Sequence, residues 1–122
     1  MVLGVGVDLV DIARFERALT RTPRLKKRLF GDIDLLDSEI SAQSLAARFA
    51  AKEAALKALG GNISGFSWHD IQVSSSRGER PTLVLSGGAL ARAQSLLASD
   101  HHLSLTHDAG MAMAFVVMEA RA

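Results

Sequence analysis

The chain has 122 residues, 48% of them hydrophobic, and a formal net charge of +1. This length fits a single domain over residues 1–122. It contains no cysteine, which excludes disulfides, thiolate metal sites and a cysteine nucleophile and suits a reducing cytoplasm. No apolar run reaches the roughly 18 residues of a membrane helix, and no secretory signal pattern is present. We therefore expect a soluble cytoplasmic protein.

The first predicted element is a strand over residues 2–9. Its apolar side chains alternate along the chain and are Val5, Val7 and Leu9. The opposite face carries Gly4, Gly6 and Asp8. Asp8 thus lies on the same face as two residues that have no side chain. Its carboxylate either helps to cap the helix that follows or takes part in chemistry.

A helix is predicted to begin at Ile12, with Asp11 as its cap and Phe15 and Leu19 on its apolar side. The other side is basic and carries Arg14, Arg17 and Arg21. After Pro23 the basic run continues with Arg24, Lys26, Lys27 and Arg28. Charge alone fits either a solvated helix face or a surface for an acidic partner.

The segment from Gly31 to Ser44 is acidic instead. Its acids are Asp32, Asp34, Asp37 and Glu39. It fits either a short helix around Leu35 and Leu36 or a loop. Its composition assigns none of these acids a role.

The clearest helix is SLAARFAAKEAALKAL, residues 44–59, because alanine and leucine favour helix strongly and Gly60-Gly61 ends it. The charged residues on this helix are Arg48, Lys52, Glu53 and Lys57. At 3.6 residues per turn, Arg48 and Lys52 share one side, and Glu53 lies about 100° further round. Lys57 is the i+4 neighbour of Glu53, so the two could also be an ordinary helix-surface ion pair.

The second half of the chain predicts strands at 68–74 and 82–85, joined by the turn SSSRGERP, then a helix over 88–98. Strands at 103–106 and 112–119 form a hairpin around residues 108–110. This order predicts an α+β domain with a mainly antiparallel sheet packed with a long central helix. Three histidines are assigned no role: His69, and His101 and His102 in a predicted loop.

The residues left for chemistry point to phosphate groups. Asp8 and Glu53 offer oxygen ligands, and magnesium takes one or two protein carboxylates together with water and substrate phosphate. The lysines and arginines nearby suit phosphates. His107 is either a hydrogen-bonded structural histidine or a further site residue. There is no GxxxxGK[ST] or GxGxxG motif, so neither a P-loop nor a Rossmann site is expected.

Three stretches carry a family resemblance: GVGVDLVDIARF at 4–15, RFAAKEAALKALG at 48–60 and SLTHDAGMAMAFVVME at 104–119. Together they resemble the holo-[acyl-carrier-protein] synthase family of 4′-phosphopantetheinyl transferases, over nearly the whole chain and in order. The resemblance implies the 4′-phosphopantetheinyl transferase fold. It also implies transfer of the phosphopantetheine arm of coenzyme A to a serine of an acyl carrier protein, with Mg²⁺ required and adenosine 3′,5′-bisphosphate released.

The resemblance also implies roles for individual residues. Asp8 and Glu53 match the family's metal ligands and are the expected catalytic residues. The positions expected to bind coenzyme A are Arg48, Lys52, Lys57 and His107. The positions expected to meet the acidic helix of the carrier protein are Arg14, Arg21 and Arg24. The family is typically a homotrimer with active sites between subunits, and no nucleic acid or membrane is expected as a partner.

Several alternatives stay open at this point. The serine nucleophile comes from the partner, and a metal-bound water, a carboxylate or His107 could accept its proton. A non-catalytic docking module and a different phosphate-handling enzyme are the competing functions. The intact Asp8 and Glu53 favour the transferase over the docking module. The sequence does not distinguish fatty-acid from polyketide carrier proteins.

Overall fold

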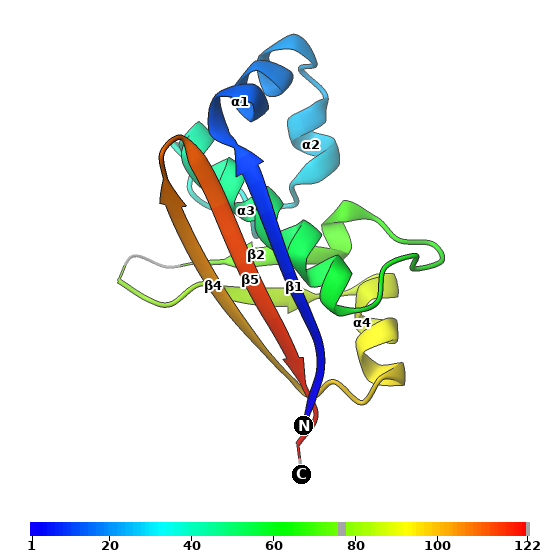
Figure 1. The fold of residues 1–122 in the computed structure, drawn as a ribbon. Coiled ribbons are helices and arrows are strands. Elements are labelled where there is room, and N and C mark those ends of the chain that lie inside the picture. Colours follow the sequence, from blue (N-terminus) through cyan, green and yellow to red (C-terminus); the bar gives the residue numbers. More distant parts are fainter. Residues whose placement is uncertain (76–77, 122) are drawn as a thin grey trace.

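The computed structural model describes residues 1–75 and 78–121 and shows an α+β domain with two antiparallel sheets (Figure 1). The larger sheet has the strand order β1-β5-β4, with bounds Val2–Asp11, Met111–Glu119 and Asp100–Asp108. The smaller pairs β2 (Ile71–Ser74) with β3 (Thr82–Leu85). The helices are α1 (Ile12–Arg21), α2 (Leu25–Leu29), α3 (Ala42–Ala58) and α4 (Gly87–Ser95), with the 3-10 helix η1 (Trp68–Asp70) before β2. The predicted fold class is confirmed.

Helix α3 is the centre of the domain and packs against one face of the larger sheet (Figure 1). Ser41 caps it, because its side chain accepts a hydrogen bond from the Ser44 amide. Small side chains let the helix approach its neighbours closely. The fully buried alanines on it are Ala46, Ala50, Ala51, Ala54 and Ala55. The predicted central helix is therefore confirmed, beginning two residues earlier than expected.

The glycines of β1 set how closely the strand lies to α3. A methyl group on Gly4 would overlap the Ala58 carbonyl oxygen, and one on Gly6 would overlap the Ala54 carbonyl oxygen. Strand and helix therefore meet main chain to main chain. The glycines provide close packing, and Asp8 follows them on the same face of the sheet.

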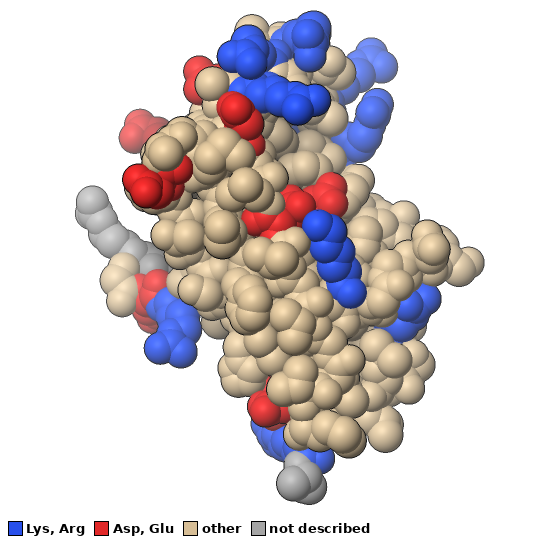
Figure 2. All heavy atoms as spheres, in the orientation of Figure 1, with Lys and Arg blue, Asp and Glu red and all other residues tan. Residues whose placement is uncertain are grey.

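The other face of the larger sheet is apolar and exposed. Its exposed side chains include Val5, Val7, Leu9, Met113 and Phe115. Strand pairing sets Val7 opposite Phe115 and Leu9 opposite Met113, so these side chains form one continuous patch. Figure 2 shows this side of the molecule as a broad area with few charged side chains.

A second core joins α1 and α2 to α3. Phe15, Leu29 and Phe30 are buried there. The Phe15 ring stacks on Phe49 with centroids 5.3 Å apart and meets Phe30 edge-on at 6.3 Å. As predicted, Asp11 caps α1, by accepting a hydrogen bond from the Arg14 amide at 2.9 Å. These contacts hold the basic helices against the domain.

The structure corrects several predicted boundaries. Residues 68–70 form η1 rather than strand, because Ser67 and Asp70 make a reciprocal capping box. Helix α4 ends before residue 98, since Leu97 adopts a left-handed conformation with φ 61°. His101 and His102 lie in β4, not in a loop.

The segment left open between helix and loop folds as turns around residues 32–35. The predicted turn over 74–81 includes residues 76 and 77, which lie outside the described residues. Among the helices of the described ranges, none is both long and apolar enough to cross a membrane.

Candidate active site

Asp8 lies where β1 approaches the last turns of α3. Its side chain is 17% exposed, and its Oδ1 is 3.2 Å from the Lys57 Nζ. The same ammonium donates to the Val7 carbonyl oxygen at 3.1 Å. Asp11, not Asp8, caps α1, so the structural explanation for Asp8 as a helix cap does not hold. Asp8 is instead a half-buried carboxylate paired with a lysine.

Glu53 faces the same place from α3. Asp8 and Glu53 line one cavity of about 320 Å³ together with Arg14 and the aromatic rings of Phe15 and Phe49. Burial raises the pKa of Glu53, the negative charge of Asp8 raises it further, and Lys57 opposes the shift. The structure thus brings the two predicted metal ligands close enough for their charges to interact.

The donors in this cavity suit a hard cation. The carboxylates of Asp8 and Glu53, on separate elements, line the cavity, as does Asp11, whose Oδ1 already accepts the cap hydrogen bond of α1. No histidine or cysteine is among the described residues that line it. In the described ranges, no cluster of three or more histidine and acidic side chains could enclose a metal. Two carboxylates leave the remaining positions to water and phosphate oxygens, which is how Mg²⁺ is commonly held. The residues present therefore fit Mg²⁺.

Lys52 lies on another side of α3 and is completely buried. Its Nζ is 2.7 Å from the Asp34 Oδ2, and both side chains are 0% exposed. The ammonium also donates to the carbonyl oxygens of Trp68, at 3.0 Å, and Ile71. Burial lowers the pKa of Lys52, and the hydrogen bond and charge of Asp34 oppose that shift. All three N–H donors are used inside the protein, so the structure does not bring Lys52 to the cavity.

Arg48 is half-buried on the same side of α3 as Lys52. Burial lowers the pKa of its guanidinium, and the charges of Asp34 and Asp37 oppose the shift. Its Nε is buried without a hydrogen-bond partner among the described residues. Arg48 therefore keeps an unused donor, beside the acidic segment rather than in the cavity of Asp8 and Glu53.

His107 lies near the end of β4, and its side chain is exposed. The order β1-β5-β4 sets this strand two strands from Asp8, roughly 10 Å away. His107 does not line the cavity of Asp8 and Glu53. Within one chain, the structure does not bring it to the carboxylates.

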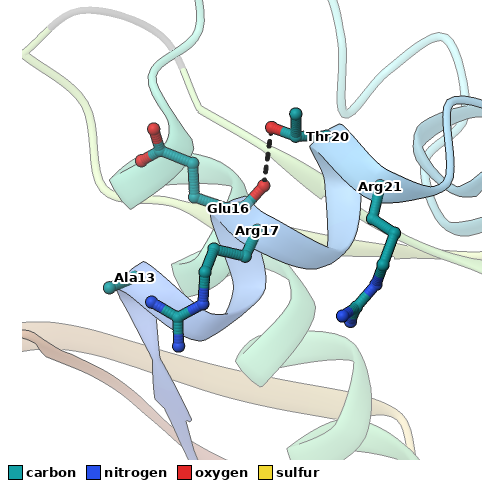
Figure 3. Close-up of a pocket in the computed structure, with 5 residues that line it drawn as sticks. All are labelled: Ala13, Glu16, Arg17, Thr20 and Arg21. Atoms are coloured by element: carbon teal, nitrogen blue, oxygen red, sulfur yellow. Dashed lines mark hydrogen bonds between the residues drawn. The ribbon is translucent and has the colours of Figure 1, made fainter.

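The basic side chains gather at one end of the molecule, over α1 and α2 (Figure 2). The predicted partner contacts Arg14, Arg21 and Arg24 are all exposed there. A second cavity, of about 530 Å³, lies along α1. Its lining residues are Ala13, Glu16, Arg17, Thr20 and Arg21. In Figure 3, Arg17 and Arg21 extend from one side of the helix, and Glu16 and Thr20 from the other. Arg17, which was predicted on the same basic side of the helix, is exposed there as well.

Sequence reasoning missed the part played by Asp34. Its Oδ2 accepts a hydrogen bond from the Gly31 amide at 3.0 Å, and its Oδ1 accepts one from the Val73 amide at 2.8 Å. With Lys52 it joins the acidic segment, α3 and β2. The available signal was its position between Ile33 and Leu35, since an acid flanked by apolar residues after a glycine is a candidate for burial.

A model of the 4′-phosphopantetheinyl transferase superfamily matches residues 4–114 of the chain. The match spans β1, all of α3 and the strand pair β4–β5 as far as Ala114. It therefore includes Asp8, Glu53, Lys57 and the basic helix α1. The chain belongs to the 4′-phosphopantetheinyl transferase superfamily.

Within this superfamily the chain is similar over its full length to the holo-[acyl-carrier-protein] synthases. One from Beutenbergia cavernae is 50% identical over 119 residues, which cover 98% of this chain and 99% of the relative. One from Leifsonia xyli subsp. xyli is 47% identical, with 98% of each chain covered. A crystal structure of the Helicobacter pylori synthase in complex with coenzyme A matches with a TM-score of 0.81 and 32% identity, covering 94% of this chain and 99% of that one. The chain is thus an enzyme of the holo-[acyl-carrier-protein] synthase family, as its three motifs indicated.

Proposed function

We propose that the chain transfers the 4′-phosphopantetheine group of coenzyme A to a serine of an apo acyl carrier protein. The reaction requires Mg²⁺ and releases adenosine 3′,5′-bisphosphate. The observation that carries this proposal is the cavity shared by Asp8, Glu53 and Arg14. It joins a two-carboxylate site to the first residue of the basic surface, so a phosphate group and an acidic protein can meet at one place.

Transfer onto a serine hydroxyl needs charge neutralisation and alignment more than a nucleophile of the enzyme's own. Mg²⁺, when bound, supplies Lewis-acid stabilisation of the pyrophosphate oxygens. Asp8 and Glu53 are the residues that would hold it, through their carboxylate oxygens. The backbone contact of Gly4 and Gly6 with α3 fixes the two carboxylates relative to each other. Lys57 lies beside Asp8 and contributes a cation for the substrate's phosphates.

The remaining cations have different places in this proposal. Arg48, which is only half-buried, keeps the role that the family resemblance implies, a contact for a phosphate of coenzyme A. Lys52 is instead assigned to the fold, because its ammonium is fully occupied by Asp34 and two carbonyl oxygens. This assignment departs from the sequence-based role of Lys52 in binding coenzyme A.

The acyl carrier protein docks on α1 and α2 in this proposal. Arg14, Arg21 and Arg24 are exposed on the basic surface that Figure 2 shows, and Arg17 lies beside them. An acidic helix would be attracted over a distance and held by several weak contacts. Arg14 also lines the cavity, so docking there would bring the partner's serine towards Asp8 and Glu53.

We also propose a homotrimer with active sites between subunits. The apolar patch of the larger sheet, on Val5, Val7, Leu9, Met113 and Phe115, is exposed in the single chain. A site between subunits would let His107 of one subunit reach the carboxylates of another, which one chain alone does not allow. Sedimentation equilibrium tests the assembly, and a monomer at micromolar concentration would contradict it.

We also propose a cytoplasmic location, with which the lack of cysteine is compatible.

The experiment for the function is mass spectrometry of an apo acyl carrier protein incubated with the chain, coenzyme A and Mg²⁺. We expect the mass of one phosphopantetheine group to be added, and no addition in a parallel reaction with EDTA. A carrier protein with its acceptor serine replaced by alanine is the matched control. No mass change with several carrier proteins and a folded enzyme would contradict the proposed function.

A further inference from the structure

Lys57 makes a bridge between α3 and the end of β1. Its Nζ is 3.2 Å from the Asp8 Oδ1 and 3.1 Å from the Val7 carbonyl oxygen. The side chain of Lys57 is 54% exposed, whereas that of Asp8 is 17% exposed. Two N–H donors of the ammonium are used, and its stem is long, flexible and largely in solvent. This contact is therefore one that can open without disturbing the core.

The two carboxylates need a cation near them. Asp8 and Glu53 line the same cavity, and two like charges at close range destabilise each other. Lys57 is the i+4 neighbour of Glu53 on α3 and touches Asp8 directly. Its ammonium is thus placed to balance both acids at once.

We propose that Lys57 is the resident counter-cation of Asp8 and Glu53 in the metal-free protein, and that a divalent cation must displace it. This inference rests on the metal site of the proposed function. The ammonium occupies Oδ1, one of the two oxygens that Asp8 could offer to a cation. A cation and an ammonium on the same carboxylate repel each other, so binding of one disfavours the other.

Displacement gives Lys57 a second use. Once its ammonium leaves Asp8, the N–H donor that Asp8 used is free, and a swing away from the Val7 carbonyl oxygen frees a second. An anionic phosphate group is the chemical class of ligand that such a cation takes. Occupation of the metal site and availability of Lys57 for a phosphate are therefore coupled through a single side chain.

The test is the affinity of the chain alone for Mn²⁺, measured by electron paramagnetic resonance of the free ion, without coenzyme A or carrier protein. Lys57→Met removes the competing ammonium and keeps the stem. We expect it to bind Mn²⁺ about fivefold more tightly than the wild type at low ionic strength, since an exposed ion pair and its repulsion of the metal are lost. Lys26→Met, which removes an exposed lysine of α2, is the matched charge control and leaves the affinity unchanged.

The Mn²⁺ affinities of the variants either support or overturn the proposed role of Lys57. Tighter binding in Lys57→Met that disappears when Asp8→Asn is added supports the proposal. Equal, weaker or undetectable binding in Lys57→Met overturns it, as does tighter binding that survives Asp8→Asn or is matched by Lys26→Met. Circular dichroism checks that the variants are folded. Failure of the proposed function shows separately, as the absence of phosphopantetheine transfer in the mass-spectrometric assay with the wild-type chain.

Discussion

Helix α3 carries two lysine–aspartate pairs five residues apart, and they differ in almost everything except chemistry. Lys52–Asp34 has both side chains at 0% exposure, whereas in Lys57–Asp8 the lysine is 54% exposed. The ammonium of Lys52 is enclosed by Asp34 and two carbonyl oxygens, whereas that of Lys57 binds the carboxylate of Asp8, which lines a cavity. The difference shows that one side of the helix is enclosed in the fold, whereas the other lies at the place where we propose that the chemistry occurs.

The largest effect is expected when the carboxylates of the proposed metal site are substituted and the buried Lys52–Asp34 pair is left intact. We expect Asp8→Asn and Glu53→Gln each to reduce kcat/KM for transfer at least about 100-fold, the loss typical of one positioned electrostatic group. Stability should change by less than about 1 kcal/mol, because neither carboxylate is part of the core. Steady-state kinetics and urea unfolding measure the two effects. Glu79→Gln, an exposed acid elsewhere, is the control, and near wild-type activity in Asp8→Asn would refute the metal assignment.

The second largest effect is expected on the free energy of unfolding, when the buried Lys52–Asp34 pair is broken. Lys52→Met leaves the Asp34 carboxylate buried without its cation, and removing one partner of such a pair costs about 3–5 kcal/mol. Urea unfolding followed by circular dichroism measures this loss. The double variant Lys52→Met/Asp34→Asn should recover part of it, since no buried charge remains uncompensated. A loss below about 1 kcal/mol in the single variant would mean that the pair does not hold α3 to the acidic segment.

A smaller effect is expected from the basic surface on α1 and α2, whose arginines belong to neither pair. We expect Arg14→Gln combined with Arg21→Gln to raise KM for the carrier protein about threefold to tenfold, because steering charges mainly affect encounter. The KM for coenzyme A should stay constant, and added salt should reduce the difference between variant and wild type. Kinetics at two ionic strengths measure this. An equal rise of KM for both substrates would place these arginines in the coenzyme A site instead.

The smallest effect is expected on the free energy of unfolding when the exposed Lys57–Asp8 pair is broken, and it compares the two pairs directly. Lys57→Met should lower stability by no more than about 1 kcal/mol, the range of exposed ion pairs. Set beside Lys52→Met, it compares the same substitution at two positions of one helix. Lys26→Met again controls for the lost charge. If the two variants were equally unstable, the division of α3 into a structural and a chemical side would be wrong.

Much of this arrangement was predictable from local pattern. Alternation along GVGVDL placed Asp8 on the glycine face, and alanine content with Gly60-Gly61 defined the central helix. Motif resemblance then indicated Asp8 and Glu53, which the structure brings into one cavity. The strand and helix predictions are confirmed because each depends on short-range geometry. The roles of Asp8 and Glu53 stay a prediction.

The features that could not be predicted from the sequence depend on long-range contacts. The helical wheel separated Lys52 from Glu53 correctly, but it gives no information on what packs against each side. Asp34 reaches Lys52 from a segment whose sequence fits helix and loop equally. The exposure of the apolar face of β1 was equally hidden, because alternation identifies two faces and tertiary packing decides which is covered.

The contact of Gly4 and Gly6 with α3 has a consequence for how the site tolerates change. The two elements that carry Asp8 and Glu53 are spaced by main-chain atoms, which are the same in every amino acid. Repacking of side chains elsewhere in the core therefore cannot widen or narrow this spacing, as long as both positions remain glycine. The distance between β1 and α3 is therefore set by their main chains, and side chains elsewhere in the core can vary without changing it.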